Sequence, residues 1–299
     1  MEAWRMPRVG VISMTYARPF TARAFPLFAR MRDADMEFVE LLVPEADEME
    51  PRAAGAALRE AGLGVLLTAR VNAMRDPASD DADVRAAGIS YLRHCIDVCA
   101  EIGAPLLGGP LYGAPLVFAG RAPRPFAEEA RAKRVAWVAE GLAEVARHAK
   151  SAGVALAIEP LNRFETDFCN TVSQALELVR LVASPACGLI LDTFHMNMEE
   201  DDLPEAIRLA GAHLLHFQAN ENHRGFLGSG HLDFSPICRA LAAIRYTGPI
   251  TLEPFRRDDR RLGVPLAQWR PPERDEDADL RRSAEVLRGL LFAAGARRC

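Results

Sequence analysis

The chain alternates short apolar runs with longer segments of helical period, and it does so eight times along its 299 residues. Turn residues bound the apolar runs, most of which carry hydrophobic side chains at successive positions. Continuous apolar runs indicate strands buried on both faces, as in a parallel sheet covered by helices. The expected strands are 9–14, 36–43, 63–69, 104–109, 154–159, 187–192, 213–218 and 249–254.

Eight strand–helix units in a chain of this length predict an α/β fold, a closed (β/α)8 TIM barrel. The alternative is an open doubly wound sheet, which usually has a glycine-rich turn after its first strand. At that position this chain has Met14, Thr15 and Tyr16, and no GxGxxG motif lies nearby. We therefore expect a single barrel domain over residues 1–299. Its helices are expected at 21–33, from Pro51 onward, and at 82–102, 125–151, 171–183, 203–210, 234–245 and 279–294.

Composition excludes several classes of protein. Hydrophobic residues make up 49% and charged residues 26%, which is typical of a soluble globular enzyme. No apolar stretch approaches the roughly 18 residues of a membrane span, and the first residues do not resemble a secretory signal, so a cytoplasmic protein is expected. The formal charge of −5 gives no indication of nucleic-acid binding. The six cysteines form no CxxC pair, which favours buried small side chains over a zinc or redox site.

A charged, proline-containing stretch at 256–279 follows the last expected strand. One interpretation is a solvated connection. The other is a loop over the mouth of the barrel, or a subunit contact, with Trp269 as its apolar anchor.

Acidic residues end three of the apolar runs. Glu159 ends the fifth run, Asp192 the sixth and Glu253 the eighth. In a barrel the C-terminal ends of the strands form the active site, so these three acids are expected to converge. Carboxylates so close together would repel one another and take up protons unless a divalent cation kept them ionised. The alternative is that each acid only begins a solvated loop.

The seventh run is expected to complete this site. His216 and Gln218 are two residues apart, so they point to the same face of the strand. Three carboxylates with one imidazole or amide form a mostly oxygen ligand set, which suits Mn²⁺, with Co²⁺ or Mg²⁺ also possible. A metal with open positions polarises a carbonyl and lets a carboxylate remove the proton from the adjacent carbon. Glu159 and Glu253 come from strands that are not neighbours, so one base on each face of a carbon would permit inversion.

Longer strings support a more specific interpretation. Four segments resemble the ketose 3-epimerases of the xylose-isomerase-like barrels, in particular the D-tagatose and D-psicose 3-epimerases. These segments are AIEPLNRFETDFCNT, LILDTFHMNMEED, HFQANENHRGFLGSGHLDF and GPITLEPF. The segment DPASDDADVRAAGISYLRHCIDVCAEIGAPLLGGPLYGAP resembles them less closely. The resemblance covers roughly residues 75–299. It implies a metal-dependent isomerase that inverts C3 of a sugar through an enediolate and works as a dimer or tetramer.

The resemblance also implies a role for each matching residue. Glu159 and Glu253 would be both metal ligands and the catalytic acid–base pair, and Asp192 would be a further ligand. Glu165 and His195 would hydrogen-bond the substrate near O1 and O2, and Arg224 would hold a substrate oxygen near the metal. The alternatives are a helix cap for Glu165, a core histidine for His195 and a surface charge for Arg224.

One position departs from the family pattern. The metal-binding histidine of the family lies six residues before the arginine, where this chain has Gln218. A glutamine there resembles the hydroxypyruvate isomerases, so an aldose–ketose or hydroxypyruvate-type isomerase is the alternative function. Gln218 ends its run at the level of the acids, and His216 lies roughly 6–7 Å deeper. We therefore predict Gln218 as a metal ligand and His216 beneath it near the substrate, whereas a bulge in the strand would favour His216 as the ligand.

Two other classes fit less well. A metal-dependent nuclease like endonuclease IV needs more histidines at strand ends than a chain with seven histidines provides. A catalytically silent sugar-binding protein would have lost one acid of the pair, yet both Glu159 and Glu253 are present.

Overall fold

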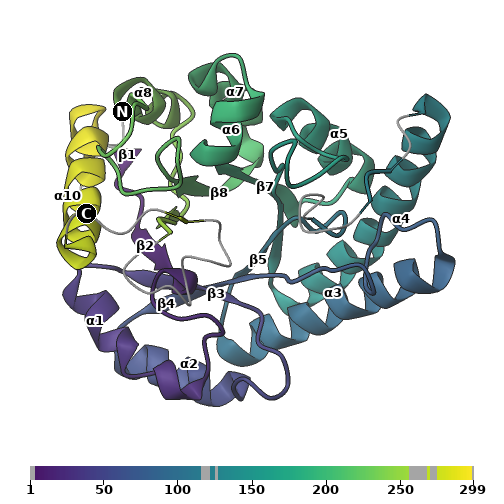
Figure 1. The fold of residues 1–299 in the computed structure, drawn as a ribbon, viewed down its shortest axis with the longest axis horizontal. Coiled ribbons are helices and arrows are strands. Elements are labelled where there is room, and N and C mark those ends of the chain that lie inside the picture. The colour runs from purple at the N-terminus through teal and green to yellow at the C-terminus, as the bar shows by residue number, and fades with distance from the viewer. Residues whose placement is uncertain (1–3, 116–121, 125–126, 256–267, 270–274, 298–299) are drawn as a thin grey trace.

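The computed structural model describes residues 4–115, 122–124, 127–255, 268–269 and 275–297. Within them, eight parallel strands pair in chain order and close into a barrel, the first strand pairing with the last. Helices surround this barrel (Figure 1). The expected α/β fold, a (β/α)8 TIM barrel, is thus confirmed. The strands are β2 (Val9–Ile12), β3 (Phe38–Leu42), β4 (Gly64–Thr68), β5 (Leu106–Gly109), β6 (Ala155–Ile158), β7 (Cys187–Asp192), β8 (Leu214–Ala219) and β9 (Ile250–Leu252).

The helices begin and end at residues that favour those positions. Asp81 caps α3 by accepting hydrogen bonds from two backbone amides of the first turn, and Gly103 ends the helix at a φ of 90°. Pro51 occupies the first turn of α2, where its missing amide costs no hydrogen bond. The helices are α1 (Leu27–Asp33), α2 (Pro51–Glu60), α3 (Ala82–Ile102), α4 (Glu128–Ala152), α5 (Val172–Val182), α6 (Thr193–Glu199), α7 (Leu203–Ala210), α8 (Phe234–Ala243) and α10 (Glu276–Ala293).

Some expected boundaries are wrong, and one helix was not expected. The helix expected at 21–33 is a 3₁₀ turn at Ala22–Ala24 followed by α1, because Pro26 offers no amide for a continuous helix. The short helix α6 was not expected. The last helix begins at Glu276, since Asp275 caps it, so the end of the charged stretch 256–279 is helical. Residues 256–267 and 270–274 of that stretch lie outside the described residues, and Trp269 is 67% exposed.

The core has two parts. The larger lies between the strands and the helices. The smaller consists of strand residues alone and fills the lower interior of the barrel: Phe38, Leu66, Leu106, Ala157 and Ile190. Gly108 leaves room for it, because a Cβ there would lie 2.3 Å from Ile190 Cδ1. The five described cysteines are buried and unpaired, as expected. No helix among the described residues combines the length and the apolarity needed to cross a membrane.

Two short strands outside the barrel were not expected. β1 (Trp4–Arg5) and β10 (Ala296–Arg297) pair in parallel and form a separate two-stranded sheet. The indole nitrogen of Trp4 donates to the backbone oxygen of Tyr246, and the amide of Ile250 donates to the backbone oxygen of Arg8. These contacts hold the pair beside the N-terminal ends of β2 and β9.

Candidate active site and metal centre

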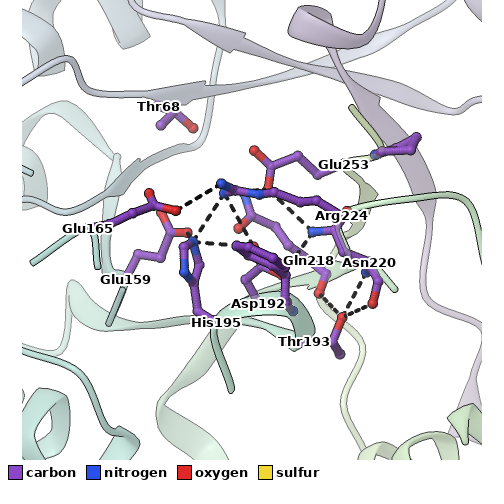
Figure 2. Close-up of polar contacts among 12 residues, drawn as sticks. Thr68, Glu159, Glu165, Asp192, Thr193, His195, Gln218, Asn220, Arg224 and Glu253 are labelled. Atoms are coloured by element: carbon purple, nitrogen blue, oxygen red, sulfur yellow. Dashed lines mark hydrogen bonds and ion pairs between the residues drawn. The ribbon is translucent and has the colours of Figure 1, made fainter. Parts of the chain in front are cut away.

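The structure brings the predicted acids together at the C-terminal ends of the strands. Glu159 follows β6, Asp192 ends β7 and Glu253 follows β9, and all three are buried. Gln218 of β8 pairs with Asp192 across the two strands and is equally buried. Figure 2 shows these four side chains around one space, with Arg224 reaching toward it.

A bulge in β8 lies below this level. Leu189 pairs with Leu214 but Ile190 pairs with His216, so one residue of β8 has no opposite partner. Above the bulge the pairing is regular and keeps Gln218 opposite Asp192. His216 Nε2 lies 2.8 Å from Thr251 Oγ1 and 3.4 Å from Glu40 Oε2. His216 therefore belongs to a layer beneath the acids, as expected from the strand spacing.

The carboxyl groups resist ionisation. Burial, reinforced by the charges of Glu253, Asp192 and Glu40, raises the pKa of Glu159 well above its ordinary value. Burial also raises the pKa of Glu253, and Arg224 only partly opposes this effect. The pKa of Asp192 is raised by burial as well. A cation placed between these groups would reverse the shifts, because it stabilises the charged form of each.

Among the described residues, four buried oxygens in and just below this cluster have no hydrogen-bond partner, and two of them belong to the predicted ligands Asp192 and Gln218. Asp192 Oδ1 accepts from the Phe194 amide and from Asn220 Nδ2, both at 2.8 Å, but its Oδ2 accepts from no group. The amide oxygen of Gln218 is also without a donor. Buried polar atoms are normally paired, so such acceptors fit a bound cation. Oxygen atoms from Glu159 and Asp192 with a nitrogen of His195 form a compact group that could hold a metal ion.

His195 contacts hydrogen-bond donors at both of its ring nitrogens. Its Nδ1 lies 3.1 Å from the backbone nitrogen of Asn162, a group that can only donate, so Nδ1 must accept. Burial lowers the pKa of His195, which keeps the ring neutral. Nε2 lies 3.1 Å from Arg224 Nη2, a group that can only donate, so a donor faces each ring nitrogen. Nε2 also lies 3.7 Å from Glu159 Oε1 and 3.6 Å from Asp192 Oδ2, at the edge of the acid cluster.

Arg224 brings a positively charged side chain to the site. Its side chain is only 14% exposed, which is incompatible with the alternative of a surface charge. Nη1 donates to Glu165 Oε1 at 3.1 Å, and Nη2 lies 3.7 Å from Glu253 Oε2 and 3.8 Å from Asp192 Oδ2. The guanidinium is stacked between the rings of Phe194 and Phe255. Glu165 thus orients Arg224, whereas the following helix, α5, is capped by Thr171.

The sequence analysis missed two polar residues. Asn220 Nδ2 donates to Asp192 Oδ1 and contacts Glu253 Oε2 at 3.4 Å, so it links two of the acids. Glu40 is fully buried in β3, beneath the cluster. An acid within a strand that is otherwise apolar on both faces was the signal for Glu40, because a buried carboxyl needs polar partners.

Comparisons with known proteins agree with this geometry. Residues 28–290 match the family described as xylose isomerase-like TIM barrel. The L-ribulose 3-epimerase of Mesorhizobium japonicum is 31% identical over 89% of this chain and 88% of its own. The ketose 3-epimerase of Arthrobacter globiformis is 33% identical over 80% and 82%. A solved L-ribulose 3-epimerase structure superimposes with a TM-score of 0.87 at 30% identity, covering 97% of this chain and 96% of that one.

Proposed function

Because the chain belongs to the xylose isomerase-like TIM barrels and, among these enzymes, to the ketose 3-epimerases, we propose that it inverts C3 of a ketose with Glu159 and Glu253 as its two bases. The observation that carries this proposal is the placement of two buried carboxyl groups at the ends of β6 and β9. These strands are separated in the barrel by β7 and β8, so the two groups approach a substrate from different directions.

The raised pKa values of both carboxyls suit proton transfer near neutral pH. One carboxylate takes the proton from C3 on one face of the sugar and leaves an enediolate across C2 and C3. The other carboxyl then donates a proton to C3 on the opposite face. The overall charge of the pair is unchanged, because one group gains the proton that the other gives up.

We also propose that the site binds a divalent cation. Glu159, Asp192, Gln218 and Glu253 would hold it through oxygen atoms, a set that favours Mn²⁺ and also suits Co²⁺ or Mg²⁺. When bound, the cation would polarise the sugar oxygens and keep the neighbouring carboxyls ionised. The unpartnered oxygens of Asp192 and Gln218 support this assignment.

Arg224 and His195 are placed to bind the sugar. Arg224 Nη2 donates to His195 Nε2 at 3.1 Å, beside Glu159 and Asp192. The guanidinium has further N–H groups that suit a sugar oxygen, such as a ketose carbonyl or hydroxyl. Glu165, which accepts from Arg224, is placed to receive a hydrogen bond from an adjacent sugar hydroxyl.

The test is product analysis in D₂O. A panel of free ketoses is incubated with the protein and Mn²⁺, and the products are examined by NMR. Deuterium at C3 of an inverted ketose supports the epimerase. Deuterium at C1 or C2, in an aldose–ketose pair, supports the second candidate function, an aldose–ketose or hydroxypyruvate-type isomerase. Gln218 in place of the family histidine is the observation that favours this second candidate.

We expect Arg224→Ala to raise KM and lower kcat, with a combined loss of about 10²-fold in kcat/KM and no change in metal content. The arginine holds substrate oxygen by a charge-assisted hydrogen bond, and a misplaced substrate reacts slowly. Steady-state kinetics with metal analysis checks this result. Arg208→Ala is the control, because Arg208 pairs with Glu205 on the outer surface of α7. Unchanged kinetics in Arg224→Ala would show that the arginine does not contact substrate.

We expect a Mn²⁺-bound crystal structure to place Gln218 Oε1 within about 2.0–2.5 Å of the ion. The pairing of Gln218 with Asp192 puts the amide at the level of the acids, whereas His216 faces Thr251 and Glu40 below. An ion bound by His216 Nε2, with Gln218 turned away, would contradict this prediction.

The proposal also covers location, assembly and domain organisation. We propose that the enzyme acts on small sugars in the cytoplasm and forms a dimer or tetramer. We also propose that one barrel domain spans residues 1–299. Size-exclusion chromatography with light scattering tests the assembly.

A further inference from the structure

A glutamine that binds a cation must present the correct end of its amide. The two ends have nearly the same shape, but one is an acceptor oxygen and the other carries two donor hydrogens. If the amide of Gln218 turned by half a turn, its NH₂ group would face the cation and repel it. A glutamine ligand therefore needs a neighbour that fixes the amide.

Glu40 is that neighbour. Its carboxyl group is fully buried in β3, and its Oε1 accepts from Gln218 Nε2 at 2.9 Å and from Thr68 Oγ1 at 2.5 Å. Its Oε2 lies 3.4 Å from His216 Nε2. A carboxylate accepts hydrogen bonds and has none to donate, so the end of the amide that faces Glu40 is the NH₂ end.

The opposite end of the same amide is the one without a partner. Gln218 Oε1 has no hydrogen-bond donor among the described residues, and neither has Oδ2 of Asp192, the residue that pairs with Gln218 on β7. We propose that Glu40 is a positioning residue: it holds the Gln218 amide so that its oxygen faces the acid cluster and can bind the divalent cation. This inference rests on the proposed metal site.

Glu40 also has a second influence that any test must separate from orientation. Its negative charge beneath the cluster would attract a cation whether or not it contacts Gln218. Glu40→Gln and Glu40→Leu both remove this charge. Glu40→Gln keeps one carbonyl oxygen for Gln218 and Thr68, and Glu40→Leu keeps none. The difference between the two variants therefore measures the effect of the hydrogen bond.

The experiment is calorimetric titration of EDTA-treated full-length protein with Mn²⁺. We expect Glu40→Leu to bind Mn²⁺ about 10–100-fold more weakly than Glu40→Gln, the usual effect of losing a hydrogen-bond partner of a metal ligand. In a Gln218→Ala background the same two substitutions are expected to give equal affinities, because the amide through which Glu40 acts is gone. A role in charge or packing alone would give the same difference in both backgrounds.

Equal affinities of Glu40→Gln and Glu40→Leu in the presence of Gln218 would overturn this inference and leave the proposed function intact. Wild-type protein that binds no Mn²⁺ would overturn both. If Glu40→Leu does not fold, the Mn²⁺-bound wild-type structure decides. Gln218 Nε2 on Glu40 with Oε1 on the ion supports the inference, and any other orientation of the amide contradicts it.

Discussion

Replacing Glu159 or Glu253 with glutamine is expected to lower kcat by about 10²–10⁴-fold, the usual contribution of a general acid or base, with a further loss from the disturbed metal site. Each substitution keeps the shape of the side chain but removes the group that carries the proton. Both residues are buried with raised pKa values, so a neutral amide is not expected to unfold the protein. Steady-state kinetics and thermal melting of each purified variant check this prediction.

Exchange of the C3 proton for deuterium in D₂O gives a second readout for the same variants. A variant with one remaining base can still remove and return the C3 proton on one face, so slow uptake of deuterium without inversion is expected from one epimer. Glu205→Gln serves as the control, because Glu205 lies on the outer surface of α7. Substantial epimerisation by either active-site variant would rule out the two-carboxylate mechanism.

Removal of divalent metal with EDTA is expected to abolish activity, and Mn²⁺ or Co²⁺ is expected to restore it better than Ca²⁺. The cluster combines hard oxygen atoms with carboxyls whose pKa values are raised by burial, and a small divalent cation would stabilise their ionised forms. Full activity in a preparation shown to be free of metal would contradict this prediction.

A second readout of the same experiment does not depend on turnover. A ligand that binds only the folded state adds about 2.7 kcal/mol at a hundred times its Kd, so Mn²⁺ is expected to raise the melting temperature of EDTA-treated protein. Asp192→Asn removes the charge of one proposed ligand but keeps an oxygen that can cap α6. We expect this variant to fold and to show a much smaller shift.

The sequence predicted the barrel and the convergence of the acids for one physical reason. Parallel strands in a closed barrel all end on the same face, so acids at the ends of separate apolar runs must meet. Glu159, Asp192 and Glu253 satisfy this condition, and Gln218 reaches the same level despite the bulge in β8. That bulge could not be read from the sequence, since HLLHFQ carries no glycine or other local sign of an irregular strand.

The contact of Glu40 with Gln218, beneath the acids, could not be predicted for a different reason. Glu40 and Gln218 are 178 residues apart, and their contact depends on the stagger of β3 against β8 across the barrel. The helix α6 was missed because LDTFHMNMEED has no clear helical period, and its start is fixed instead by Asp192, which accepts from the Phe194 amide. Two-residue strands such as β1 and β10 leave no periodic pattern at all.

The small sheet of β1 and β10 has a practical consequence. It lies beside the N-terminal ends of β2 and β9, on the face of the barrel away from the acids, and it brings residues near both ends of the chain together. Figure 1 shows both ends on the same side of the molecule, next to α8 and α10. An affinity handle or a tether to a solid support, joined next to either strand, would therefore leave the mouth of the barrel facing the solution. A support loaded in this orientation keeps every site open to incoming sugar.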